Sequence, residues 1–319
     1  MTSVTLQLIV TQADTAAQDV RRFELRRTDG SALPTFTAGA HIRVKTPLGA
    51  WRNYSLSNHP QESDRYEIAV KREGRGRGGS LSMVDGVRVG DLLEVHAPEN
   101  QFALDERATQ VLLIAGGIGI TPLLSMALYL LSQDKPFKLV YLTREPASTA
   151  FADLLSTPAF AGKVLIHHDQ GQPELALDLW PLLEKPGSVT GRQLYCCGPQ
   201  GLMDAVRDMT GHWPNAAVHF ESFGVDTSTR TDDQPFEVSL RSNGRVYEVP
   251  VGRSILEVLR DQGLHIPSSC ESGTCGSCKT ALLEGQPDHR DLVLMDEEKA
   301  DHIMVCVSRA RGGTLMLDL

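Results

Sequence analysis

Four cysteines near the C-terminus carry the strongest chemical signal in the sequence. Cys270, Cys275 and Cys278 lie within SSCESGTCGSCKTALLEG, and Cys306 follows 28 residues later. Such a group can form disulfides, bind zinc or hold an iron–sulfur cluster. Zinc sites usually use two close pairs of ligands, whereas three clustered cysteines and one remote cysteine suit two irons with two ligands each. The spacing therefore favours a 2Fe-2S cluster over zinc and over disulfides.

The segment RNYSLSN carries side chains that suit a flavin. Arg52, Tyr54 and Ser55 place a cation, a flat ring and a hydroxyl at neighbouring positions of a predicted strand. These groups can meet the phosphate and the ring system of a flavin. A surface strand that carries Tyr and Arg for other reasons is the alternative interpretation.

Further along, GRGRGGSLS at residues 74–82 predicts a short helix that begins at Gly78, Gly79 and Ser80. Backbone N–H groups at such a start, with Arg77 beside them, can bind a phosphate. A glycine-rich turn with solvated arginines is the alternative. Taken together, the two motifs favour a flavin site.

Two further segments point to a nicotinamide nucleotide. AGGIGITP at residues 115–122 follows an apolar strand pattern and begins a helix, so a pyrophosphate could approach the backbone there. In CCGPQGLMD, Cys197 stands at a predicted strand end beside Gly198 and Pro199, where it could reach the nicotinamide ring. A buried thiol before a turn is the alternative, and we expect Cys196 to be buried in any case.

The predicted secondary structure that positions these residues differs between three parts of the chain. Residues 4–104 show short alternating runs broken by Gly, Pro and Asn, which predict an antiparallel barrel or sandwich. From residue 111 an unbroken apolar run, VLLIAGG, opens a series in which strands alternate with helices near 150–156 and 200–210, as in a doubly wound parallel sheet. A hairpin signal at Asn243-Gly244 and a short helix ended by Gly263 then predict an α+β domain with a mixed sheet.

These patterns divide the chain into domains. We expect a flavin-binding β-barrel at 1–105, a nucleotide-binding α/β domain at 106–225, a linker at 226–235 and an iron–sulfur domain at 236–319. The linker prediction rests on GVDTSTRTDDQP, which has almost no apolar residue.

Composition and charge exclude several classes of function. The chain has 319 residues with a formal net charge of −9, and no part is basic enough to indicate binding of nucleic acid or anionic membranes. The sequence lacks an apolar run long enough for a membrane span and a signal-peptide pattern, so we expect a cytoplasmic protein. The acidic C-terminal third could face a basic patch on a protein partner or could be a solvated surface.

The order of these motifs resembles the ferredoxin-reductase superfamily with a plant-type ferredoxin fused at the C-terminus, a domain with the β-grasp fold. Within that superfamily the sequence is most similar to the phthalate dioxygenase reductases. The similarity spans essentially the whole chain, and it rests on the flavin, nucleotide and cysteine motifs together with CCGPQGLMDAVRDMTGHWP, HFESFG and DHRDLVL.

The resemblance implies FMN as the flavin and NADH as the hydride donor. It implies that the FMN is lined by Arg52, Asn53, Tyr54, Ser55, Ala69, Val70, Lys71, Arg77, Gly78, Gly79, Ser80 and Thr121. The nicotinamide nucleotide would be lined by Gly116, Gly117, Thr143, Arg144, Cys197, Gly198 and Pro199. Asn53 stands where close relatives are expected to have Thr, which leaves its hydrogen bond to FMN open. Phe223 would stack near the flavin, although the residues alone favour a core position.

The same resemblance implies a route for the electrons. A hydride would pass from NADH to the flavin, and single electrons would leave through the cluster to a Rieske-type oxygenase that attacks aromatic rings. The catalytic residues would be Ser55 as a donor to the flavin, Cys197 and Glu221 as nicotinamide-orienting groups, and Phe223. We expect a monomer that meets the oxygenase transiently.

Three other functions are compatible with the residues. The chain could be a stand-alone NADH diaphorase or ferric reductase, or the reductase of a Rieske monooxygenase that demethylates its substrate. It could also be an electron-transfer module whose flavin and nucleotide motifs have no function.

Overall fold

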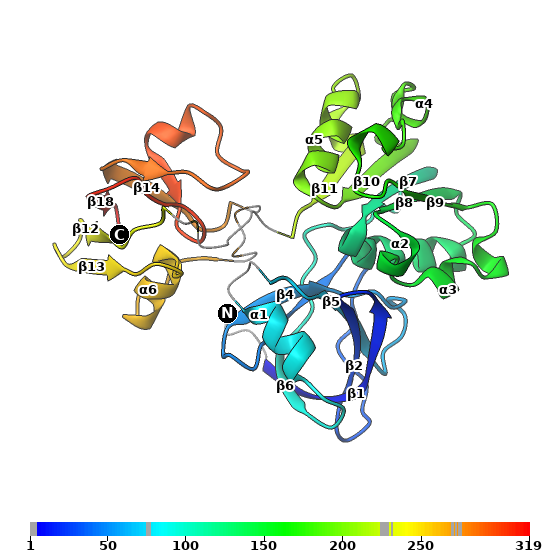
Figure 1. Ribbon diagram of the computed structural model, residues 1–319, viewed down its shortest axis with the longest axis horizontal. Helices are drawn as coiled ribbons and strands as arrows, with labels where there is room; N and C mark the ends of the chain where they lie inside the picture. The colour runs from blue at the N-terminus through cyan, green and yellow to red at the C-terminus, as the bar shows by residue number, and fades with distance from the viewer. Residues whose placement is uncertain are drawn as a thin grey trace. The chain divides into compact units, whose positions relative to one another are not determined.

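The computed structural model describes residues 5–74, 78–223, 230, 232–268, 271, 273 and 276–319. The chain divides into two compact units, one ending at Ser222 and one running from Phe223 to Leu319. The first unit holds an antiparallel and a parallel sheet, and the second holds a mixed sheet (Figure 1). The second unit also holds a separate two-stranded sheet, and the predicted fold class is confirmed for the three larger sheets.

The N-terminal part of the first unit is a six-stranded antiparallel barrel with the strand order β4-β3-β6-β1-β2-β5. Apolar residues alternate along β1 between the interior and solvent, as a strand with one buried face requires. The edge strands β4 and β5 meet where Leu56 bridges to Ile68 and Ser57 N donates to Glu67 O at 2.9 Å, and this closes the sheet. The strands are β1 Thr5–Ala17, β2 Val20–Arg26, β3 His41–Lys45, β4 Trp51–Ser55, β5 Tyr66–Lys71 and β6 Leu92–His96.

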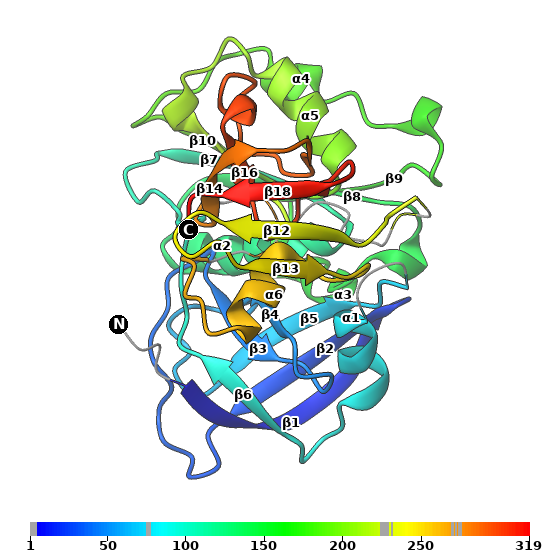
Figure 2. The same ribbon diagram turned by 90° about the vertical axis from the view of Figure 1, so that its left-hand side faces the viewer.

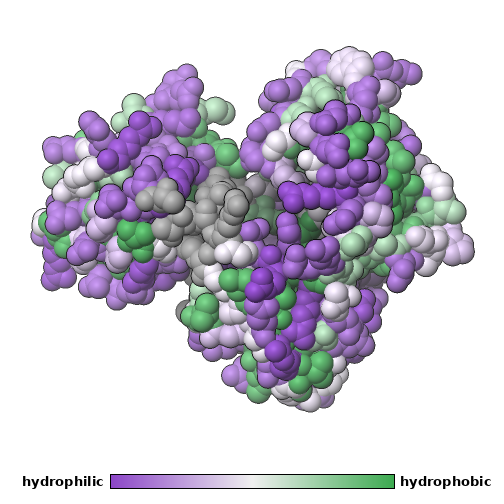
Figure 3. Space-filling view, in the orientation of Figure 1, coloured by the Kyte–Doolittle hydropathy of each residue, from purple (hydrophilic) through white to green (hydrophobic). Residues whose placement is uncertain are grey.

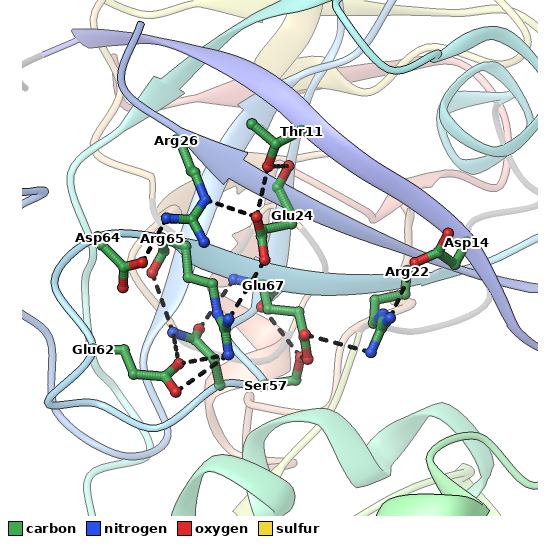
Figure 4. Close-up of polar contacts among 11 residues, drawn as sticks. Thr11, Asp14, Arg22, Glu24, Arg26, Ser57, Glu62, Asp64, Arg65 and Glu67 are labelled. Atoms are coloured by element: carbon green, nitrogen blue, oxygen red, sulfur yellow. Dashed lines mark hydrogen bonds and ion pairs between the residues drawn. The ribbon is translucent and has the colours of Figure 1, made fainter. Parts of the chain in front are cut away.

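Polar side chains reinforce this closure (Figure 4). Ser57 Oγ donates to Glu67 Oε1 at 2.9 Å, next to the backbone contact between the same residues. Glu24 on β2 accepts hydrogen bonds from Arg26 Nε and Thr11 Oγ1, each at 2.7 Å. Burial by itself would raise the pKa of Glu24, but these hydrogen bonds hold it below its ordinary value. This network holds β2, β5 and the residues that follow β4 in place relative to one another.

The second part of the first unit is a five-stranded parallel sheet with the order β11-β10-β7-β8-β9. Its central strand β7 is buried from its second residue onward, as the unbroken apolar run predicted. The strands are β7 Gln110–Gly116, β8 Phe137–Thr143, β9 Val164–His168, β10 Arg192–Cys197 and β11 Val218–Glu221. The helices are α2 Ile120–Ser132, α3 Ala152–Leu155, α4 Trp180–Leu183 and α5 Gln200–Met209.

Helices cover both faces of this sheet. Leu113 of β7 packs in one core with α2, whereas Leu112 and Ile114 pack in a second core with Met203 and Val206 of α5. Because neighbouring strand residues point to opposite faces, the two cores lie on opposite sides of the sheet. The prediction of a doubly wound sheet is confirmed.

The barrel and the parallel sheet share a hydrophobic core. Val20, Ala38, Ala69 and Phe102 of the N-terminal part pack in the same cluster as the side chains of α2. This common core explains why the two parts form one compact unit. The domain boundary near residue 105 stays a prediction.

The second unit is a mixed sheet with the order β13-β12-β18-β14-β16, in which β12 and β18 run parallel. Figure 2 shows β18, β12 and β13 side by side, with α6 next to them. Its elements are β12 Phe236–Leu240, β13 Val246–Val249, α6 Ile255–Asp261, β14 Lys279–Glu284, β15 Pro287–Asp288, β16 His302–Met304, β17 Arg309–Ala310 and β18 Thr314–Leu317.

Local signals place these elements. Ser254 caps α6 by accepting from Glu257 N at 3.1 Å, and Gly263 just beyond the helix has φ +80°. The predicted hairpin forms between β12 and β13, and Gly244 in its turn has φ +65°. The end of the predicted linker is tied to this unit, because Asp233 forms a buried ion pair with Arg290.

Short helical turns connect the longer elements. The π-helix η1 Ser82–Gly86 continues α1 Gly79–Leu81. The 3-10 turns are η2 Gly117–Gly119, η3 Pro146–Ser148, η4 Pro158–Phe160, η5 Pro173–Leu175, η6 Asn215–Ala217 and η7 Glu298–Ala300.

Among the described residues, no helix has the length and apolar character needed to cross a membrane. On the face drawn in Figure 3, hydrophobic side chains form small separate groups within a mostly hydrophilic surface.

Candidate functional site

The predicted flavin motif lies on β4, the edge strand that meets β5 where the barrel closes. Arg52, Asn53 and Tyr54 are half-buried, and Ser55 is buried at the end of the strand. Burial raises the pKa of the Tyr54 phenol well above its ordinary value, so the ring carries a neutral hydroxyl. The antiparallel bridge just after Ser55 brings this strand alongside β5.

On β5 the three predicted flavin residues differ in exposure. Ala69 and Val70 are buried, and their side chains belong to two hydrophobic cores of the unit. Lys71 at the end of the strand is exposed. The first two residues can therefore offer a cofactor only their backbone, whereas Lys71 can offer its ammonium group.

Gly78, Gly79, Ser80 and the side chain of Arg52 lie together in a group that we name the phosphate cradle. Gly78 has φ +79° and precedes α1, so the predicted helix start is confirmed. A Cβ atom on Gly79 would stand 3.2 Å from Arg52 Nε, so the arginine lies directly over this glycine. Ser80 Oγ accepts from Glu73 N at 3.1 Å, which holds the two ends of the loop together. Arg77 lies outside the described residues.

The cradle suits a phosphate. Its glycines have no side chain of their own between a phosphate and the backbone N–H groups, and Arg52 adds a fixed positive charge. Arg52 Nη1 donates to Trp51 O at 2.8 Å, which restrains the guanidinium group.

Ser55, Cys197 and Glu221 come together although they lie on three strands. Ser55 Oγ at the end of β4 donates to Glu221 Oε2 on β11 at 3.3 Å. Cys197 is the register partner of Glu221 in the parallel pair β10–β11. The structure thus joins the predicted flavin and nicotinamide residues at the carboxyl ends of the parallel strands, where open α/β sheets bind ligands.

Burial controls the charges in this group. It raises the pKa of the Glu221 carboxyl to about 8, and the hydrogen bond from Ser55 only partly offsets this effect. Burial and the nearby Glu221 carboxylate raise the pKa of the Cys197 thiol well above its ordinary value. Both groups are therefore mainly neutral at pH 7.

The two glycine loops of the nucleotide prediction pack against each other. A Cβ atom on Gly116 would stand 2.6 Å from Pro199 Cδ, and one on Gly198 would stand 3.0 Å from Gly116 Cα. These glycines are therefore required by loop packing. Gly117 differs from them, because it has φ +53° and open space where a side chain would lie.

Sequence reasoning missed Gly119. A Cβ atom there would stand 2.1 Å from Cys197 O, so this glycine lets the start of α2 approach the strand end that carries Cys197. The third glycine of GGIGITP was the available signal, but only the structure shows what it faces.

The remaining predicted cofactor residues, Thr121 for the flavin and Thr143 and Arg144 for the nucleotide, lie near the start of α2 and the end of β8. Thr121 is buried and its hydroxyl donates to Ile118 O at 3.1 Å, so it serves the helix start. Thr143 is also buried, and its hydroxyl contacts His168 Nδ1 at 2.8 Å. Arg144 is exposed beside the turn at Gly171. Of these three, Arg144 has the side chain most accessible to a ligand.

Phe223 is 46% exposed and begins the second unit. The core position that its residue type favoured is therefore wrong. Its stacking on a flavin stays a prediction.

The cysteine site lies in the second unit. Cys278 immediately precedes β14 and Cys306 follows β16, and both thiols are buried. Lys279 and Met304 are register partners, so the two cysteines lie at the same end of this strand pair. Cys270 and Cys275 lie outside the described residues. The two described thiols fit a cluster that is held by one loop and one remote cysteine.

The comparisons with known proteins agree with this arrangement. Residues 7–104 match the family described as an oxidoreductase FAD-binding domain, and residues 238–311 match the family described as a 2Fe-2S iron-sulfur cluster binding domain. The fold and the two sites thus define a flavin- and 2Fe-2S-dependent oxidoreductase.

More specific similarity extends over the whole chain. It is 58% identical over 304 residues to the phthalate 4,5-dioxygenase oxygenase reductase subunit of Pseudomonas putida, covering 95% of this chain and 93% of that protein. It is 53% identical over 315 residues to the phthalate dioxygenase reductase of Burkholderia cepacia, with 98% and 97% covered. A solved phthalate dioxygenase reductase structure matches with a TM-score of 0.92 and 52% identity, covering 99% of this chain and 98% of the other. The chain belongs to the family of the phthalate dioxygenase reductases.

Proposed function

We propose that this protein is the NADH-dependent reductase component of a two-component, Rieske-type aromatic-ring dioxygenase of the phthalate type. Its flavin would be FMN, and it would act as a cytoplasmic monomer in the breakdown of aromatic compounds. The observation that carries the proposal is the contact of Ser55 on the barrel with Glu221 on the parallel sheet, at 3.3 Å, in a chain that also carries the cysteine site.

The flavin, when bound, accepts a hydride and returns electrons one at a time. Arg52 and the glycines of the phosphate cradle hold its phosphate in this proposal. Ser55 holds the edge of the ring system, and its hydrogen bond to Glu221 Oε2 fixes the position of the serine hydroxyl. Cys197 and Glu221 orient the nicotinamide, and their neutral state at pH 7 suits an uncharged ring.

The remaining predicted residues have supporting roles in this proposal. Tyr54 and Phe223 stack on the flavin, while Lys71 and Arg77 add positive charge near its phosphate. Gly117 and Arg144 receive the pyrophosphate and ribose of NADH, because both are open to a ligand.

We assign the exit of electrons to the second unit. Cys270, Cys275, Cys278 and Cys306 hold the cluster, and the oxygenase meets the surface beside them in a transient complex. Leu292 is 43% exposed and its N–H donates to Gly273 O of the cysteine loop at 2.9 Å, and Met295 is 68% exposed. Exposed apolar side chains on the segment that contacts the cysteine loop suit a short-lived contact with a partner.

The visible spectrum of the purified protein tests the cofactors. The proposal requires flavin and iron–sulfur absorption, and both must bleach when NADH is added without oxygen. A protein that lacks flavin bands would be an electron-transfer module and not a reductase.

A coupled turnover assay tests the role. The protein should reduce a phthalate-type oxygenase much faster than it reduces free dyes or ferric chelates. Equal rates with all acceptors would indicate a stand-alone diaphorase. If the protein reduces a demethylating oxygenase faster, the proposed partner is wrong and the proposed route of the electrons still holds.

A further inference from the structure

The turn between β3 and β4 is held firmly in place. Gly49 N donates to Thr46 O at 2.8 Å, and Thr46 N donates to Ala50 O at 2.8 Å. Pro47 restricts the backbone at the second position of the turn, and Gly49 has φ +80° at the fourth. The residue between them, Leu48, therefore has a well-defined position.

Leu48 lies against the phosphate cradle. A Cβ atom on Gly78 would stand 3.2 Å from Leu48 Cδ1, so the tip of the leucine covers the open side of this glycine. Pro47 continues the contact, because its Cγ would stand 3.8 Å from a Cβ atom on Gly86 at the end of η1. Leu48 is otherwise 68% exposed, so truncating it should cost little stability.

The cradle therefore has two unlike walls. Arg52 covers Gly79 with a guanidinium group, whereas Leu48 covers Gly78 with methyl groups. The single phosphate of a mononucleotide flavin can lie between these walls with its charge toward Arg52. A dinucleotide flavin must continue beyond this point, and on the Gly78 side its second phosphate would meet an apolar side chain. Placing a charged group against these methyl groups costs desolvation energy.

We infer that Leu48 makes this site selective for FMN over FAD. The inference rests on the proposed flavin site and assigns the preference for a mononucleotide to one side chain. The glycines and Arg52 bind the phosphate that both flavins share, and the leucine excludes the remainder of FAD.

The test measures binding and not turnover. Full-length protein is stripped of flavin and titrated separately with FMN and FAD, and flavin fluorescence reports each dissociation constant. The Leu48→Ala variant should bind FAD roughly 10- to 100-fold more tightly than the unmodified protein does, with little change for FMN. Leu175→Ala is the matched control, because Leu175 is also an exposed leucine, 40% accessible, on the distant turn η5.

The outcomes separate this inference from the proposed function. If the unmodified protein prefers FMN and Leu48→Ala leaves the FMN-to-FAD ratio within about twofold of its original value, Leu48 is not the selective residue and only the inference fails. If the unmodified protein binds FAD more tightly than FMN, the proposed cofactor and the inference both fail. An equal gain in FAD affinity in Leu175→Ala would also overturn the inference, since it would show a nonspecific effect.

Discussion

The titration of Glu221 offers a direct test of the contact between the barrel and the parallel sheet. Replacing Glu221 by Gln keeps a side chain of the same shape that can still accept from Ser55, but it removes the ionisable group. The pKa of Glu221 is raised from 4.5 to about 8, mainly because the carboxyl is buried. The folded protein therefore holds this proton more tightly than the unfolded chain does.

The sign and size of the effect follow from linkage. A raised pKa contributes stability that is fully present below pH 4.5 and is lost as the pH rises through about 8. Between these two pH values, each pH unit removes about 1.4 kcal/mol of this stability. Roughly 2 kcal/mol is therefore lost between pH 6 and pH 8, because the loss levels off as the pH reaches the folded-state pKa. For a unit of this size, that free energy corresponds to about 4–8 °C in the unfolding temperature.

The assay compares thermal unfolding of the full-length, flavin-free protein and of Glu221→Gln at pH 6 and pH 8. Other groups titrate in this range, but they do so in both proteins, so the difference between the two isolates Glu221. The variant should become more stable relative to the original as the pH rises. Glu174→Gln, at an exposed glutamate of η5, should show no such change. The reasoning would be refuted if the difference in unfolding temperature between Glu221→Gln and the original protein were the same at pH 6 and pH 8.

Three further changes test other parts of the structure. Gly119→Ala should lower the free energy of unfolding by about 1–3 kcal/mol or more, because its Cβ atom would stand 2.1 Å from Cys197 O. Gly201→Ala is the control: its Cβ atom would meet nothing within 4 Å, so the change should be neutral or stabilising. Urea unfolding measures both effects. Cys278→Ser should remove the iron–sulfur absorption and leave NADH-dependent dye reduction, and loss of both would show that the two units are not separable. Met295→Glu should slow reduction of the oxygenase at least about 5-fold while dye reduction stays unchanged, and unchanged oxygenase kinetics would remove Met295 from the proposed contact surface.

The elements were predictable from the sequence because their signals are local. The unbroken apolar run of β7, the capped helix α6 and the hairpin at Asn243-Gly244 each depend on residues that are close in the chain. Alternating polarity likewise identified the strands of the barrel.

The site was only partly predictable, because its geometry depends on contacts between distant segments. Motifs indicated that Ser55, Cys197 and Glu221 matter, but their meeting depends on barrel closure and on the parallel register of β10 and β11. Ser55 and Glu221 are separated by 166 positions in the chain. The role of Gly119 was not predictable, since a glycine without φ > 0° shows its purpose only through what it faces. Residue type misled at Phe223, because an aromatic side chain in an apolar segment usually indicates a core position.

The shared core under the site explains how such distant residues can act together. A 3.3 Å contact between a barrel strand and a sheet strand requires that the two parts cannot slide past each other. Ala38 and Phe102 of the N-terminal part share a core with α2, and a Cβ atom on Gly39 would stand 2.8 Å from Met126 Cε of that helix. Close packing of this kind resists small displacements, because interiors are nearly as dense as crystals. The joint between the two parts therefore fixes the geometry of the proposed hydride site, while the loops that carry Gly117 and Arg144 remain open to the nucleotide.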